Sequence, residues 1–108
     1  METNDSDLLA LGGNIQLAGF SVLDKSELIV VKKVVGSYAR KFSDQYTGFQ
    51  GLHLTLKELH KREKSEIFQV SGRVIIDGKT HAVEDDDRNL FFCIDAVMKK
   101  LETVALKG

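Results

Sequence analysis

The chain has 108 residues, of which 43% are hydrophobic, and its 15 lysine and arginine residues against 16 aspartate and glutamate residues give a net charge of −1. The length and composition are typical of one soluble globular domain with its own core. Because the net charge is close to zero, a contact with nucleic acid would depend on local clusters of cations. The single cysteine excludes an internal disulfide and favours a reducing cytoplasm, and no apolar run approaches the roughly 20 residues of a membrane span.

The first part of the chain predicts a tail, a strand and a helix. Residues 1–13 are acidic at first and end in a glycine pair, so we expect a flexible N-terminal tail followed by a single domain over 14–108. Residues 14–20 predict a first strand, with Ile15 and Leu17 on one face and Gln16 and Ala18 on the other. Over residues 24–43, apolar residues recur every three or four positions, which predicts a helix, and Asp24 followed three residues later by a glutamate is typical of a capping box.

Three further strands are expected in the middle of the chain. Alternating runs within residues 52–76 predict two strands, and the polar, basic link at 60–65 predicts an exposed hairpin loop between them. The pair Asp77-Gly78 tolerates the positive φ angles of a tight hairpin turn and predicts a last strand over residues 79–84.

The end of the chain predicts one long amphipathic helix. Apolar residues recur at three- and four-residue steps from Leu90 to Val104 and fill one side of a helical wheel. The three aspartates at 85–87 suit the positive end of a helix dipole, and Asp87 is the expected N-cap.

This order of elements predicts an α+β fold, β-α-β-β-β-α. The first β-α-β unit is expected to cross over right-handed with its strands parallel, and the other strands are expected to follow as an antiparallel meander. The result is a four-stranded mixed sheet with both helices packed on one face, while the other face stays wet.

The last hairpin and helix contain the most specific motifs of the chain. These motifs are Asp77-Gly78-Lys79, Ala82-Val83-Glu84, Leu90-Phe91-Phe92-Cys93-Ile94-Asp95-Ala96-Val97 and Lys100-Leu101-Glu102. Together with the order of elements, they resemble the ribosome hibernation-promoting factor family, which includes protein Y, also called ribosome-associated inhibitor A. A weaker similarity covers residues 15–22, so the resemblance spans about residues 14–107.

The resemblance implies a function in translation regulation under stress. A member of this family sits on the small ribosomal subunit, in the channel of messenger and transfer RNA, and silences or protects idle ribosomes without catalysis. Its partner is ribosomal RNA, which it contacts through basic residues. Position by position, the resemblance carries over Lys100 on the last helix and Lys57 after the second strand.

Other candidate RNA-binding residues follow from the predicted surface. A row of cations lies opposite the apolar stripe of the first helix, where it would track a phosphate backbone, and further cations lie in the 60–65 loop and on the open sheet face. An aromatic residue on the outer face of the last helix would stack on a base. The full candidate set is Lys25, Lys32, Lys33, Arg40, Lys41, Lys57, Lys61, Arg62, Lys64, Arg73, Phe92, Lys99 and Lys100.

Each group also has a plain structural alternative. The cations of the first helix suit an ordinary solvated helix face, and the 60–65 loop suits a turn that blunts a sheet edge. The alternative for Phe92 is that it packs under the N-terminal tail or lies in a homodimer contact. The alternative function is a protein-interaction module of the same fold that has lost ribosome binding, which the near-neutral charge and Phe92 favour.

The titratable residues predict no catalytic or metal site. His53, His60 and His81 lack the spacing of paired metal ligands, and helix capping explains the acidic run 84–87 better than binding of a hard cation does. Cys93 borders the apolar stripe and is expected to be a small core residue. We therefore expect no enzyme activity and no cofactor.

Overall fold

The computed structural model describes residues 8–10, 14–60 and 66–107, and its elements follow the predicted order β-α-β-β-β-α after one additional strand. The helices are α2 (Lys25–Gln45) and α3 (Leu90–Lys107), and a 3-10 turn, η1 (Phe20–Val22), leads into α2. The strands are β1 (Leu8–Ala10), β2 (Ile15–Ala18), β3 (Phe49–His60), β4 (Glu66–Ile76) and β5 (Lys79–Asp87).

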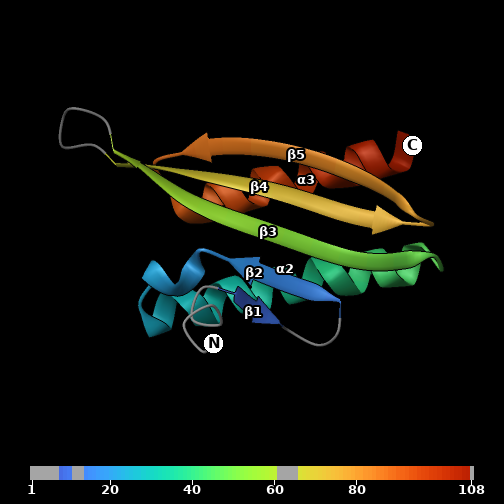
Figure 1. Ribbon diagram of the computed structural model, residues 1–108, viewed down its shortest axis with the longest axis horizontal. Coiled ribbons are helices and arrows are strands. Elements are labelled where there is room, and N and C mark those ends of the chain that lie inside the picture. The colour runs from blue at the N-terminus through green and yellow to red at the C-terminus, as the bar shows by residue number, and fades with distance from the viewer. Residues whose placement is uncertain (1–7, 11–13, 61–65, 108) are drawn as a thin grey trace.

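One mixed sheet carries both helices on the same face, with α2 behind β2 and β3, and α3 behind β4 and β5 (Figure 1). The strand order is β1-β2-β3-β4-β5. β2 and β3 are parallel, with Leu17 opposite Leu54, because α2 forms the crossover between them. The β3–β4 and β4–β5 pairs are antiparallel. The predicted α+β fold, with β2 to β5 as its mixed sheet, is therefore confirmed.

The additional strand lies in the segment that the sequence assigned to a flexible tail. Residues 8–10 form β1, which pairs antiparallel with β2. Without this partner, β2 would present a row of unpaired backbone N–H and C=O groups at the sheet edge. The tail prediction is thus wrong for residues 8–10, and its remainder, residues 1–7 and 11–13, lies outside the described residues.

The core lies between the sheet and the two helices. Alternate residues of β2, β3 and β4 point toward the helices, as the two-residue period of a strand requires. They meet the apolar faces of α2 and α3 in one cluster of buried side chains. Its fully buried large members are Phe20, Phe42, Leu17, Leu52, Leu54, Ile94, Met98, Leu101, Val31, Val35, Val70 and Val74.

The start of α2 has the predicted capping box. The Asp24 carboxylate accepts the backbone N–H of Glu27 at 2.8 Å, and the Glu27 carboxylate accepts the N–H of Asp24 at 3.2 Å. The hydrogen bond from the Glu27 N–H, with a further one from the Ser26 hydroxyl, holds the pKa of the Asp24 carboxyl below its usual value. This end of the helix is therefore fixed by local contacts, as expected.

The start of α3 is capped by a different residue from the one predicted. Asn89 Oδ1 accepts the N–H of Phe92 at 3.0 Å. Asp87 instead ends β5, opposite Phe68 of β4, and accepts the N–H of Asn89 at 2.9 Å. The prediction of Asp87 as N-cap is wrong, because pairing with β4 extends the last strand through the whole acidic run.

Gly72 of β4 is buried directly beneath α3. A Cβ atom added to Gly72 would lie 2.6 Å from Val97 Cγ1 and 3.1 Å from Leu101 Cδ1. Val97 is β-branched and fully buried, so its side chain has little room to rotate away. We therefore expect Gly72→Ala to lower the free energy of unfolding by about 1–3 kcal/mol in urea denaturation.

A double variant checks the cause of that loss. If the Val97 methyl group is the obstacle, Gly72→Ala combined with Val97→Ala should lose less stability than the sum of the two single losses. Strictly additive losses would show that the close approach of β4 to α3 at this position is not what makes glycine necessary.

Candidate RNA interface

The outer face of α2 carries four exposed cations: Lys25, Lys32, Lys33 and Arg40. The opposite side of the helix, which includes the buried Val35, packs on the sheet, so the cations project away from the protein body. Within the part of the chain that the structure describes, none of the four forms an ion pair with a carboxylate. We call this surface the α2 cation face.

Two other predicted cations have acidic partners within the protein. Lys41 Nζ lies 3.0 Å from a carboxylate oxygen of Glu102 and so connects α2 with α3. Lys99 Nζ lies 3.1 Å from a carboxylate oxygen of Asp95, one helical turn earlier. These exposed pairs contribute little to stability, but they reduce the positive potential that each lysine offers to an external phosphate.

Lys100, which the family resemblance carried over, is held against the edge strand β5. Its Nζ donates to the backbone oxygen of Glu84 at 3.0 Å and lies 3.4 Å from the carboxylate of Asp85. The Cys93 thiol donates to the backbone oxygen of Asp85 at 3.3 Å. These hydrogen bonds from side chains of α3 tie the helix to the backbone of the edge strand. The contacts of Lys100 therefore indicate a structural role.

Cys93 itself is fully buried. Burial, with a smaller effect of the neighbouring aspartates, raises the pKa of its thiol from 9.0 to about 11. At pH 8 we expect the folded protein to react with a disulfide reagent about a hundredfold more slowly than the urea-unfolded chain, because the reactive thiolate is both scarce and covered. Equal rates in the two states, followed by absorbance of the released thiolate, would contradict the burial of this side chain.

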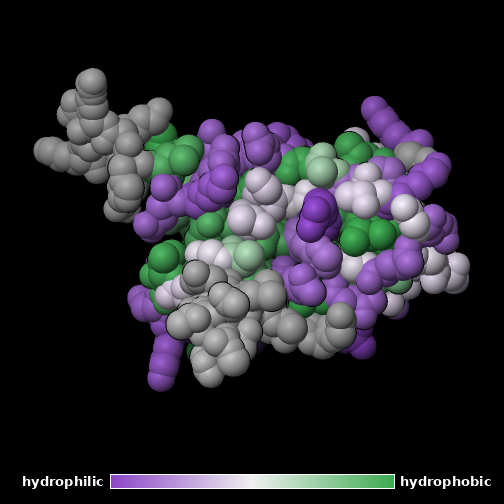
Figure 2. All heavy atoms as spheres, in the orientation of Figure 1, coloured by the Kyte–Doolittle hydropathy of each residue, from purple (hydrophilic) through white to green (hydrophobic). Residues whose placement is uncertain are grey.

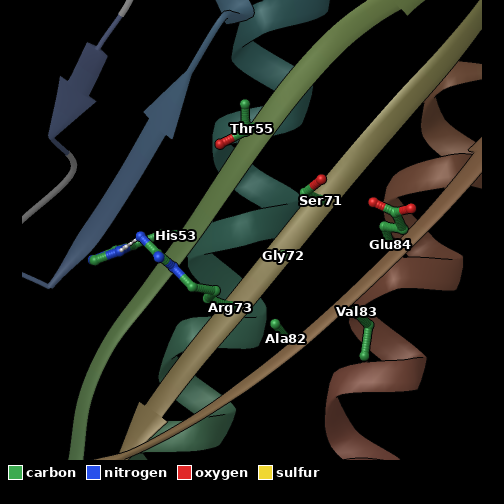
Figure 3. A pocket seen from close by; sticks show the side chains of 8 residues that line it. All are labelled: His53, Thr55, Ser71, Gly72, Arg73, Ala82, Val83 and Glu84. Carbon is green, nitrogen blue, oxygen red and sulfur yellow. Dashed lines mark hydrogen bonds between the residues drawn. The ribbon is translucent and has the colours of Figure 1, made fainter.

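Lys57 and Arg73 lie on the open face of the sheet, away from the helices. Their neighbours Leu56 and Val74 are buried toward the helices, so Lys57 and Arg73 point to the other side. Arg73 Nη2 donates to His53 Nδ1 at 3.3 Å (Figure 3). Burial, with the adjacent Arg73 charge, lowers the pKa of His53, which keeps the ring neutral and able to accept this bond.

An open depression of about 550 Å³ occupies the same sheet face. Thr55, Ser71 and Glu84 lie side by side across β3, β4 and β5, and Arg73 lies on the next row (Figure 3). The lining thus contains one cation, Arg73, and one carboxylate, Glu84. Because the two charges offset each other, this depression attracts phosphate less than the α2 cation face does. Figure 2 shows hydrophobic residues on this side in separate patches rather than one continuous area.

Phe92 is 67% exposed on the outer face of α3. Lys99 lies seven residues further on and Leu106, which is 78% exposed, another seven, so the three share one side of the helix. The remaining candidates, Lys61, Arg62 and Lys64, lie outside the described residues.

The structure therefore separates the predicted residues instead of gathering them into one surface. Figure 1 shows α2 behind the sheet, and the α2 cation face lies on this helix side. Lys57 and Arg73 lie on the open face of the sheet instead, because they alternate with the buried Leu56 and Val74. The prediction also left out Ile29 and Gly36, which lie among the cations of α2. Their spacing of three or four residues from those cations would have revealed them on the helical wheel.

Comparison of the chain with models of protein families, and separately with curated proteins, found no match. Among the described residues, no helix combines the length and the apolar character needed to cross a membrane. Over the same residues, no group of three or more histidine, cysteine, aspartate or glutamate side chains is placed to hold a metal ion. Function is therefore inferred from the fold and from its charged surfaces.

Proposed function

We propose that the protein is a non-catalytic, ribosome-associated factor of the hibernation-promoting type, which binds ribosomal RNA of the small subunit through the α2 cation face. The observation that carries the proposal is a contrast between surfaces. The cations of the α2 cation face have no acidic partner among the described residues, whereas Lys41, Lys99 and Lys100 each have one. The resemblance of residues 77–102 to that family, and its order of elements, support the proposal further.

The mechanism is electrostatic binding followed by steric blockage. Cations along a helix neutralise phosphates and release their counterions, so the logarithm of affinity falls with the logarithm of salt concentration by about 0.9 per phosphate. Four such contacts correspond to a loss of about a hundredfold between about 50 and 200 mM salt. The bound protein occupies the channel of messenger and transfer RNA in the cytoplasm, and no chemical step is required.

Sedimentation through a sucrose gradient tests the proposal. The protein should migrate with small ribosomal subunits at about 50 mM salt and largely leave them at about 200 mM. Migration at the top of the gradient at both salt concentrations would overturn ribosome binding. Co-migration that does not change with salt would overturn the electrostatic mechanism.

The outer face of α3 favours a second candidate function, a protein-interaction module of the same fold. Phe92 and Leu106 expose apolar side chains there, and Asp95 neutralises Lys99 between them. Such a face suits an apolar contact, for which a second copy of the chain is the simplest partner. Sedimentation equilibrium would then show a dimer that persists at high salt and is lost in Phe92→Ser, and a monomer in the unsubstituted protein would exclude this arrangement.

A further inference from the structure

The α2 cation face has an internal layout of three parallel lines. Residues seven apart on a helix lie on nearly the same line, and residues three or four apart lie on neighbouring lines. Two lines of cations therefore flank a central line that carries no charge. The lines are Lys25–Lys32, Ile29–Gly36 and Lys33–Arg40.

Gly36 makes a notch in the central line. Apart from its chain neighbours and the backbone of its own helix, a Cβ atom added there would meet no heavy atom of the described residues within 4 Å, so packing against other elements does not require a glycine. Glycine inside a helix is less stable than alanine, because it loses more backbone freedom on folding. What the missing side chain does provide is close access to the helix backbone from outside.

Ile29 adds an apolar contact point to the same line, since its side chain is 55% exposed. The face as a whole therefore offers a narrow strip without charge, partly apolar and partly hollow, between two rows of cations. A single cation row would suit one phosphate backbone, whereas this arrangement matches two backbones with an accessible surface between them.

We infer that the ligand of the α2 cation face is double-helical RNA, with α2 lying over the minor groove so that each cation line reaches the phosphates of one strand. This rests on the proposed function and specifies the form of RNA that it involves. The minor groove of A-form RNA is wide and shallow and displays ribose hydroxyls and base edges, which the Ile29–Gly36 line would meet. The minor groove of B-form DNA is only about 6 Å wide and does not admit a helix, and its major groove, which does, lacks the ribose hydroxyls that the Ile29–Gly36 line would meet.

A single strand fits this surface less well. Proteins that hold single-stranded nucleic acid usually stack its bases on aromatic side chains. The cation lines and the strip between them contain no aromatic residue among the described residues of α2. Duplex RNA is therefore the form that the layout favours.

Fluorescence anisotropy with the full chain tests the inference. The probes are a labelled RNA duplex of about 16 base pairs, one of its strands alone and the DNA duplex of the same sequence. At about 50 mM salt we expect the RNA duplex to bind at least about tenfold more tightly than either other probe.

Gly36→Leu is the diagnostic variant. The new side chain should lift the helix from the groove and weaken RNA-duplex binding by about tenfold, through lost phosphate contacts. Because leucine is the better helix former, the same change should raise the midpoint of thermal unfolding. If Gly36 had only a structural role, RNA affinity and the midpoint of thermal unfolding would change in the same direction. Thr103→Leu, an exposed position on α3, is the matched control and should leave RNA affinity unchanged.

The outcomes distinguish the inference from the proposed function. Equal affinity for duplex and single strand, or undiminished duplex binding by Gly36→Leu, would overturn the inference while the salt-dependent sedimentation stands. Absence of binding to every probe, together with free migration on the gradient, would overturn both.

Discussion

Replacing Phe42 with alanine is expected to lower the free energy of unfolding by about 3–5 kcal/mol. The Phe42 ring is 1% exposed, and its centroid lies 6.3 Å from that of Tyr46 and 6.2 Å from that of Phe49. These rings fasten the end of α2 to the start of β3, where the chain turns back into the sheet. Removing the central ring would leave a cavity and break both aromatic contacts, each of which stabilises the fold beyond the area it buries.

Phe92→Ala is the matched control for this prediction, because it removes the same atoms from a side chain that is 67% exposed. Its effect should stay within about 0.5 kcal/mol. Urea unfolding followed by far-UV circular dichroism measures both variants. Small domains are stable by only about 5–15 kcal/mol, so the Phe42 variant should unfold at clearly lower urea. Similar losses for the two variants would contradict the burial of one ring and the exposure of the other.

The parts of the fold that were predicted correctly depend on residues close together in the sequence. The turn at Asp77-Gly78 needs two residues that tolerate positive φ, and both have it, at 53° and 78°. The capping box at Asp24 needs only the residue three positions later. Such contacts are independent of how the rest of the chain packs, which is why the sequence alone indicates them.

The parts that were missed depend on partners far along the chain. An acidic run before an apolar repeat has the local character of a helix start, yet residues 85–87 pair with residues 68–70 and remain in the strand. The short strand at 8–10 likewise depends on the open edge of β2 rather than on its own residues. In both cases, pairing between strands overrides local preference.

The same distinction applies to the candidate site. The helical wheel correctly placed the cations of α2 on an exposed face, because burial of the opposite stripe determines that placement. It could not show that Lys41 meets Glu102 on the other helix, or that Lys100 reaches across to β5. Lys99 and Asp95, by contrast, have the i,i+4 spacing of a helical ion pair, so the sequence alone would have indicated their contact.

Reversing Lys32, Lys33 and Arg40 together to glutamate is expected to abolish co-migration with small ribosomal subunits. Three contacts with phosphate would become three repulsions, and the affinity should fall by on the order of a hundredfold or more at about 50 mM salt. All three side chains are exposed, and among the described residues none has an acidic partner to lose. The far-UV circular dichroism spectrum should therefore stay unchanged.

A second triple variant separates the position of the charges from their number. Lys79, Arg88 and Lys107 are exposed and lie outside α2, and their reversal to glutamate changes the net charge by the same amount. If RNA is bound by the α2 cation face, this control should still co-migrate with the subunits and keep most of its salt dependence. Equal loss in both variants would show that overall charge governs the association. Binding that is retained in the α2 variant and lost in the control would place the contact elsewhere on the protein, because Lys32, Lys33 and Arg40 would then not be the residues that meet phosphate.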